Sequence, residues 1–186
     1  MINHSKSYTR ARMRYFIGID IPPKTKIAIQ HWRDKTWVQH TELGSVPAAN
    51  FHITLAFLGQ VKPQLLDPLL EQLNQLNNRP FQLTIDQFNV WQKPSIAWLG
   101  FSSPVCQLDQ LQLSVSRCAR NAAIQLTERK YIPHITLARK CKNLTARPLI
   151  APYFRFNVEQ FCLFESVSTA SGVQYPIRHQ WPLNGP

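Results

Sequence analysis

The strongest constraint on the fold is a pentapeptide that occurs twice in the chain. Residues 52–56 and residues 134–138 both read His-Ile-Thr-Leu-Ala. The two copies are 82 positions apart (134 − 52), which is close to half of the 186 residues. Identical segments in matching strand-like contexts are the mark of an internal duplication. The repeat therefore predicts a chain built from two related lobes, each carrying one copy.

Alternation of side chains along a strand gathers the polar residues of each copy on one face. Residues two positions apart share a face, so His52 and Thr54 point one way while the apolar residues between them pack on the other. The same spacing holds for His134 and Thr136. If a pseudo-twofold axis relates the lobes, the two polar faces meet across a cleft. Such a site offers two imidazoles and two hydroxyls around one small anion.

The remaining chain intersperses strand and helix patterns without a regular βαβ alternation. This arrangement favours an α+β fold of largely antiparallel sheet over a doubly wound parallel sheet. One helix is expected to begin with Asp67 as its N-cap and Pro68 in its first turn, and Ser95–Phe101 is the expected partner of the strand at 81–86. The predicted strands are 15–21, 51–58, 81–86, 95–101, 132–139, 153–165 and 173–181, and the other predicted helices are 24–40 and 108–122.

The composition of the chain indicates its binding partners and its compartment. The 21 Lys and Arg residues outnumber 10 Asp and Glu residues, so the net charge of +11 attracts polyanions and phosphates. The apolar runs are far shorter than the roughly 20 residues of a membrane helix, and no signal peptide is evident. We therefore expect a cytoplasmic protein without a membrane partner. Residues 1–12 are interpreted as a disordered basic leader, and residues 13–186 as a single two-lobed domain.

The four cysteines have spacings that match neither a zinc pair nor a dense disulfide framework. They are Cys106, Cys118, Cys141 and Cys162. We expect free, mostly buried thiols that serve packing rather than reactivity.

Two histidines around one anion suit phosphodiester cleavage by paired acid and base. A neutral imidazole can take a proton from water or a hydroxyl, while a protonated one gives a proton to the leaving oxygen. This scheme requires neither a metal nor another cofactor. A zinc site would need a third ligand, and neither copy supplies one at ligand spacing. Signatures of a serine or cysteine nucleophile and of a Walker loop are missing from the sequence.

The segments around the two copies resemble the two-histidine phosphoesterases. Residues 49–59 and 133–139 look most like the bacterial RNA 2′,3′-cyclic phosphodiesterase branch, also called 2′-5′ RNA ligase. The resemblance extends through residues 15–22, residues 98–100 and the region of Tyr175, and it covers nearly everything after residue 12. It implies a bilobed fold in which the two motifs face each other across a central groove.

The resemblance also implies roles for individual residues. His52 would donate a proton to the leaving 3′ oxygen, and His134 would accept one from water, so that a 2′-phosphate remains. Thr54, Thr136 and Arg139 would bind the phosphate. In the ligase direction an RNA 5′-hydroxyl replaces water and forms a 2′-5′ linkage without ATP. The substrate would be an RNA or nucleotide with a 2′,3′-cyclic phosphate, and one chain completes the site, so a monomer is expected.

Arg139 does not fit the simple strand pattern. It lies five residues after His134, so perfect alternation would send its side chain to the opposite face. The expected role therefore predicts a bulge or a strand end between the two residues. Tyr131 and Phe51 could stack on a base, but aromatic residues more often lie in the core, so packing is the favoured interpretation for both.

Two other functions compete with this one. Another two-histidine phosphoesterase could act on ADP-ribose cyclic phosphate or on 2′-5′ oligoadenylate. An RNA-binding module, in which the paired motif is only a phosphate clamp, is the alternative outside enzymes. Turnover that disappears when either histidine is replaced would favour an enzyme over such a module.

Overall fold

The computed structural model describes residues 13–36, 44–141, 147–170 and 172–185. The predicted leader lies outside these residues, as does the last part of the helix expected at 24–40. Strands and helices alternate irregularly, and all strand pairings are antiparallel over the described residues. The prediction of a largely antiparallel α+β fold is confirmed.

The first copy of the pentapeptide lies in the larger sheet, at its edge. This sheet has the order β10 (Gly172–Gln174), β9 (Gln160–Thr169), β1 (Arg14–Asp20) and β3 (His52–Gln60), and β11 (Ile177–Pro182) also pairs with β9. Strand β3, which begins at His52, pairs with β1 alone among the described strands. The first motif is therefore hydrogen-bonded to a neighbouring strand on one side, where β1 lies.

The second copy lies in a different sheet, where it has a strand on each side. The order there is β2 (Gly44–Ser45), β7 (Ile135–Arg139), β6 (Ile96–Gly100) and β5 (Gln87–Trp91). Strand β7 begins at Ile135, so His134 lies just before it rather than inside the strand predicted at 132–139. The two lobes thus carry the motif in unequal strand surroundings.

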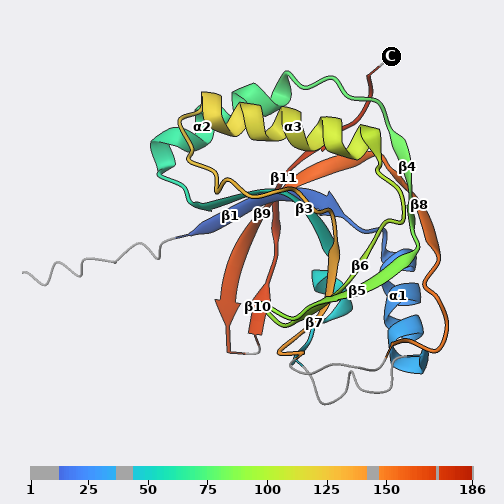
Figure 1. The fold of residues 1–186 in the computed structure, drawn as a ribbon. Helices are drawn as coiled ribbons and strands as arrows, with labels where there is room; N and C mark the ends of the chain where they lie inside the picture. Colours follow the sequence, from blue (N-terminus) through green and yellow to red (C-terminus); the bar gives the residue numbers. More distant parts are fainter. Residues whose placement is uncertain (1–12, 37–43, 142–146, 171, 186) are drawn as a thin grey trace, which may run out of the picture.

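Three helices cover the sheets in the described part of the chain (Figure 1). Helices α2 (Pro63–Asn74) and α3 (Cys106–Asn121) lie side by side across the larger sheet, and α3 packs on β3. Helix α1 (Pro23–Thr36) packs beside β8 (Phe154–Val158), the partner of β4 (Phe81–Ile85). The helix predicted at 108–122 is confirmed by α3, whose stripe from Leu108 to Cys118 is buried. None of these helices is long and apolar enough to cross a bilayer.

One continuous core joins the sheets. Ile17 and Ile53 from the larger sheet and Leu99 and Ile135 from the second belong to the same cluster of buried side chains. This shared core fixes the two sheets relative to each other, and with them the two motifs. Cys118, Cys141 and Cys162 are buried and Cys106 is exposed, all as free thiols. The expectation of mostly buried, free cysteines is confirmed.

The predicted start of α2 was wrong. The helix begins at Pro63 with Lys62 as its N-cap, and Pro68 lies inside it. An interior proline removes one helical hydrogen bond. However, Leu69 and Leu73, which follow Pro68 in the helix, are fully buried in the core. The packing of these two leucines stabilises the helix despite the proline. Rules based on local sequence do not take such packing into account.

Three strand predictions also need correction. The strand at 95–101 pairs with β5 and β7, whereas β4 pairs with β8, about 75 residues further along the chain (157 − 82). The single strand expected at 153–165 is divided into β8 and β9, and the one expected at 173–181 is divided into β10 and β11. Periodicity identifies strands but carries no information about which distant strand will pair with them.

Candidate active site

Both copies of the pentapeptide contain a β-bulge at the same leucine. In the β1–β3 pair, Gly18 is opposite Thr54 and Ile17 is opposite Ala56, so Leu55 has no partner. In the β6–β7 pair, Trp98 is opposite Thr136 and Ala97 is opposite Ala138, so Leu137 is passed over in the same way. An extra residue of this kind bends the strand and reverses the alternation that follows it.

The bulge explains where the residue after each pentapeptide points. Leu55 and Ala56 are both buried, as are Leu137 and Ala138, and each pair is followed by an exposed residue. That residue is Arg139 in the second copy, which ends β7. The prediction of a bulge or strand end before Arg139 is confirmed. In the first copy the corresponding position holds Phe57, whose side chain is 57% exposed.

The main chain holds both imidazoles in the same tautomer. Nδ1 of His52 lies 2.7 Å from the carbonyl oxygen of Asn50, and Nδ1 of His134 lies 2.7 Å from that of Ile132. A carbonyl oxygen only accepts, so each Nδ1 must carry the hydrogen and donate it. Each Nε2 is therefore the atom left to gain or lose a proton. Two polar faces with this property are what acid–base catalysis requires.

An aromatic cluster surrounds His52. Its ring centroid lies 4.7 Å from that of Phe16, 5.0 Å from that of Tyr175 and 5.9 Å from that of Phe164. Burial among these rings lowers the pKa of His52 to about 4, because the charged imidazolium loses contact with water. The positive charge of His134 lowers this pKa further, which couples the two histidines directly.

His134 packs against a different pair of rings. Trp91 meets it edge-on with centroids 4.7 Å apart, and Trp98 lies 6.0 Å away. Burial again lowers the pKa of His134, and the charge of Arg139 acts in the same direction. Arg139 also lowers the pKa of His52. The positive charge of Arg139 therefore acts on both histidines.

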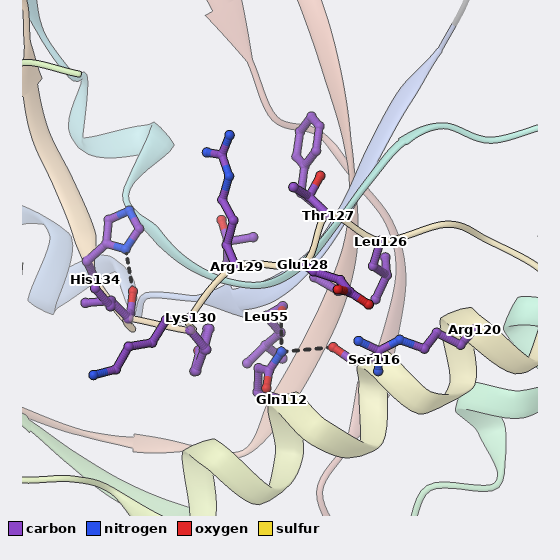
Figure 2. Close-up of a pocket in the computed structure, with 15 residues that line it drawn as sticks. Leu55, Gln112, Ser116, Arg120, Leu126, Thr127, Glu128, Arg129, Lys130 and His134 are labelled. Carbon is purple, nitrogen blue, oxygen red and sulfur yellow. Dashed lines mark hydrogen bonds between the residues drawn. The ribbon is translucent and has the colours of Figure 1, made fainter. Parts of the chain in front are cut away.

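Residues from the two copies also meet in a cavity beside His134 (Figure 2). Thr54 and His134 both line it, together with Tyr131 and residues of α3. Thr136 is half-buried two residues beyond His134 on β7. The structure thus brings together His52, His134, Thr54 and Arg139 from two sheets, with Thr136 on the same strand as the second histidine.

Two residues that the sequence analysis did not single out support His52. Lys26 on α1 forms an ion pair with Asp20, with 2.6 Å between Nζ and Oδ1, and also donates to the carbonyl of Ala49 at 3.1 Å. Ala49 belongs to the 3-10 turn η2 (Ala48–Asn50), whose last residue accepts the hydrogen bond of His52. Because α1 and β3 are distant in sequence, no local pattern indicates this link.

The two candidates for base stacking differ in accessibility. Phe51 has no exposed surface, and the guanidinium of Arg33 lies 5.7 Å from its ring centre. It cannot contact a ligand, so the favoured interpretation of Phe51 as a core residue holds. Tyr131 lines the cavity, while its hydroxyl is buried without a hydrogen-bond partner in the described part of the chain. In the same ranges, no three His, Cys, Asp or Glu side chains gather where they could share a metal ion.

Known proteins share both this sequence and this fold. The model of the LigT-like phosphoesterases matches residues 19–98. The RNA 2′,3′-cyclic phosphodiesterase of Escherichia coli K12 is 31% identical over 172 residues, which cover 91% of this chain and 96% of that protein. The chain belongs to the LigT-like phosphoesterase family.

Solved structures of the family agree with this membership. The ligand-free structure of E. coli LigT superimposes with a TM-score of 0.85 at 30% identity, covering 92% of this chain and 98% of that one. The complex of E. coli LigT with 3′-AMP gives the same TM-score, identity and coverage. The fold and the family expected from the paired motifs are therefore confirmed.

Proposed function

We propose that this protein is a phosphodiesterase that opens the 2′,3′-cyclic phosphate at the end of an RNA and leaves a 2′-phosphate. The observation that carries the proposal is the matched pair of imidazoles, each with Nδ1–H bonded to the main chain and Nε2 free for proton transfer. The names of the family's curated relatives support the choice of a cyclic phosphate on RNA as the substrate.

The resemblance to the family supports a division of roles between the two histidines. We assign His52 as the acid that protonates the leaving 3′ oxygen, and His134 as the base that takes a proton from the attacking water. The ribose that keeps the phosphate then lies on the side of His52, and the nucleophile enters from the side of His134. Thr54, Thr136 and Arg139 would hold the non-bridging oxygens, Arg139 through charge-assisted hydrogen bonds.

A lowered pKa is compatible with His52 as the acid once the substrate is bound. The cyclic phosphate carries a negative charge, and an anion beside an imidazole favours its protonated form. Substrate binding therefore raises the pKa of His52 from its low value in the free protein. The base must be neutral, and the charge of Arg139 favours the neutral form of His134, while it acts in the same direction on His52.

Product analysis tests this function. The intact protein is incubated in excess EDTA with a short RNA that ends in a 2′,3′-cyclic phosphate, beside His52→Ala and His134→Ala variants. We expect a 2′-phosphate from the wild type and a loss of about 10²- to 10⁴-fold in rate from either variant. A 3′-phosphate product, or turnover that survives both substitutions, would refute the proposal.

The same assay covers the competing functions. ADP-ribose cyclic phosphate and 2′-5′ oligoadenylate are offered as alternative substrates under identical conditions. If one of these alternative substrates is cleaved and the RNA is not, the protein has a different two-histidine phosphoesterase activity. Tight RNA binding without turnover, unchanged by replacing either histidine, would identify a binding module. We further propose that the monomer is active, which light scattering during turnover would check.

A further inference from the structure

Lys26 joins the two parts of the main chain that set the position of His52. Its Nζ lies 2.6 Å from Oδ1 of Asp20 and donates to the carbonyl oxygen of Ala49 at 3.1 Å. Asp20 is paired with His52 across the β1–β3 ladder. Ala49 belongs to the turn η2, whose last residue, Asn50, accepts the hydrogen bond from Nδ1 of His52. One ammonium group therefore connects the strand opposite the histidine with the turn that orients its ring.

A second hydrogen bond ties the same turn to the C-terminal part of the larger sheet. The side-chain amide of Asn50 donates to the carbonyl oxygen of Val173 on β10 at 2.7 Å. The hydrogen bonds of a 3-10 turn have poorer geometry than those of an α-helix, so a turn of three residues depends on such outside contacts for a fixed position. Lys26 and Asn50 together fix the carbonyl oxygen that accepts from His52.

Helix α1, which carries Lys26, has other anchors in the fold. Ile29 on this helix has no exposed surface. Nη1 of Arg33, one turn further along, donates to the carbonyl oxygen of Val46 at 2.7 Å. These contacts already hold the helix against the rest of the molecule. The bonds of Lys26 therefore serve mainly the segment that they reach, which is the support of His52.

The second motif has no counterpart of this arrangement among the described residues. The carbonyl that accepts the hydrogen bond of His134 belongs to Ile132, between α3 and β7, where the chain forms neither helix nor strand. Apart from His134 itself, no described side chain donates to the carbonyl groups of residues 130–132. The arrangement around Lys26 is therefore specific to the first motif, whose histidine has the proposed role of acid.

The charge of Lys26 acts on the ring as well as on the turn. Its side chain is 15% exposed, so water and salt screen the ammonium group only in part. Burial lowers the pKa of His52 most, and the charges of His134, Lys26 and Arg139 lower it further. An acid with a lowered pKa gives up its proton more readily. The cation thus suits a histidine that must protonate a leaving oxygen.

From these contacts we infer that Lys26 is a positioning residue for His52, which it holds so that Nε2 is directed at the leaving 3′ oxygen. This inference rests on the proposed function, in which His52 protonates that oxygen. Lys26 touches neither the substrate nor the reacting atoms, and it keeps its own proton throughout. A misplacement of the imidazole by about 1 Å can lower the rate about 10²-fold.

A double-mutant cycle tests the inference. Lys26→Met is introduced into the wild type and into His52→Ala, and single-turnover rates are measured with a short RNA that ends in a 2′,3′-cyclic phosphate. A residue that acts through His52 lowers the rate only where His52 is present. A residue that acts on folding or on substrate binding lowers the rate equally in both backgrounds. The cycle therefore separates positioning of the acid from a general structural role.

The expected rates follow from what each substitution removes. Lys26→Met keeps the length of the side chain without its charge, and it should slow the wild type about 10- to 100-fold but His52→Ala by less than about twofold. Lys26→Arg keeps the charge and the N–H donors, so it should recover most of the rate. Lys24→Met is the matched control and should equal the wild type, because Lys24 is exposed on the same helix and takes no part in these contacts.

The pH profile adds a measurement that a purely structural role would not change. Removing the charge of Lys26 raises the pKa of His52 in the free protein, and the carboxylate of Asp20, left without its partner, acts in the same direction. The pH optimum of kcat/KM should therefore move to higher pH in Lys26→Met and stay in place in Lys24→Met. The other ionisable groups that face His52 are unchanged in both variants: His134, Arg139 and Tyr175.

Several outcomes would overturn the inference. If Lys26→Met slows the wild type and His52→Ala by the same factor, Lys26 acts on folding or binding and not on the acid. If its rate and pH optimum equal those of the wild type, Lys26 has no effect on His52. If Lys24→Met shows the same loss, only the overall charge matters. A wild type that does not open the cyclic phosphate, or a His52→Ala variant that retains the full rate, instead refutes the proposed function itself.

Discussion

Strands β3 and β7 carry the same five residues, the same bulge and the same hydrogen bond from Nδ1 to the carbonyl two positions back, yet their surroundings differ. His52 sits among Phe16, Phe164 and Tyr175 at the edge of its sheet. His134 packs on two tryptophans within its sheet and opens onto a large cavity. The shared backbone provides two equivalent Nε2 atoms for proton transfer, and different side chains surround each of them.

The largest expected effect separates the acid from the base. If sulfur replaces the leaving 3′ oxygen of the cyclic phosphate, the leaving thiolate needs no proton, because a thiol is far more acidic than a sugar hydroxyl. His52→Ala should then recover most of the roughly 10²- to 10⁴-fold that it loses with the oxygen substrate, while His134→Ala should not. Single-turnover rates with both substrates make the measurement. Rescue of His134→Ala instead would exchange the two roles.

The second prediction compares two glycines, one beside each motif. A Cβ on Gly18 would lie 2.6 Å from the carbonyl oxygen of Ile53, between His52 and Thr54. A Cβ on Gly100 would come still closer to an atom, but that atom lies at the far end of a side chain, in the six-membered ring of Trp98. Main chain yields less readily than the end of a side chain, so Gly18→Ala should destabilise the fold by about 1–3 kcal/mol and Gly100→Ala by less. Denaturant unfolding of both variants checks this order, and a larger loss for Gly100→Ala would contradict it.

The third prediction concerns the residues that follow the two pentapeptides. Arg139→Ala removes a cation that faces both histidines, so the pKa values of His52 and His134 should rise. If Arg139 binds the phosphate as proposed above, the variant also loses a charge-assisted hydrogen bond to the substrate, which should lower kcat/KM about tenfold or more. Steady-state kinetics with Arg117→Ala as the control for lost charge would measure the effect. An equal loss in both variants would mean that only the overall charge matters.

The smallest expected effect is a shift in the pH optimum. One histidine must be protonated and the other neutral, so kcat/KM is greatest at the mean of their two pKa values in the free protein. Both values are lowered from 6.5, so the optimum should lie below pH 6.5. Tyr175→Ala exposes His52 to water, which raises its pKa and moves the optimum to higher pH. A profile that does not move would show that Tyr175 has no part in desolvating His52.

The sequence predicts the motif strands and one of their irregularities. The conflict between the expected role of Arg139 and its parity relative to His134 predicts a bulge in the second copy, and the register shift at Leu137 confirms it. The same bulge at Leu55 could have been inferred from the identity of the two pentapeptides. It was missed because the residue that follows is Phe57, whose exposure is not expected for an aromatic side chain.

Other features depend on contacts that a single sequence does not contain. Tyr175 reaches His52 because β10 and β11 both fold back onto β9, and Lys26 reaches the turn before His52 because α1 packs against it. For Phe51 the sequence left base stacking open beside the favoured core packing, since an aromatic residue beside a histidine is compatible with both. Its neighbours across the core, rather than its neighbours along the chain, decide between the two.

The fixed Nδ1 hydrogen bonds also govern how the protein resets between turnovers. Nδ1 of each ring is bonded to a carbonyl oxygen and does not take part in proton transfer, so every proton enters and leaves through Nε2. With the roles proposed above, each opening of a cyclic phosphate leaves His52 neutral and His134 protonated, the reverse of the starting state. Before a further hydrolysis, His52 must regain a proton and His134 must lose one. Water or the departing product carries these protons between each ring and the solvent. The reverse reaction, which closes the ring from a 2′-phosphate, needs His52 neutral and His134 protonated. The released protein is already in that state and can begin ring closure at once.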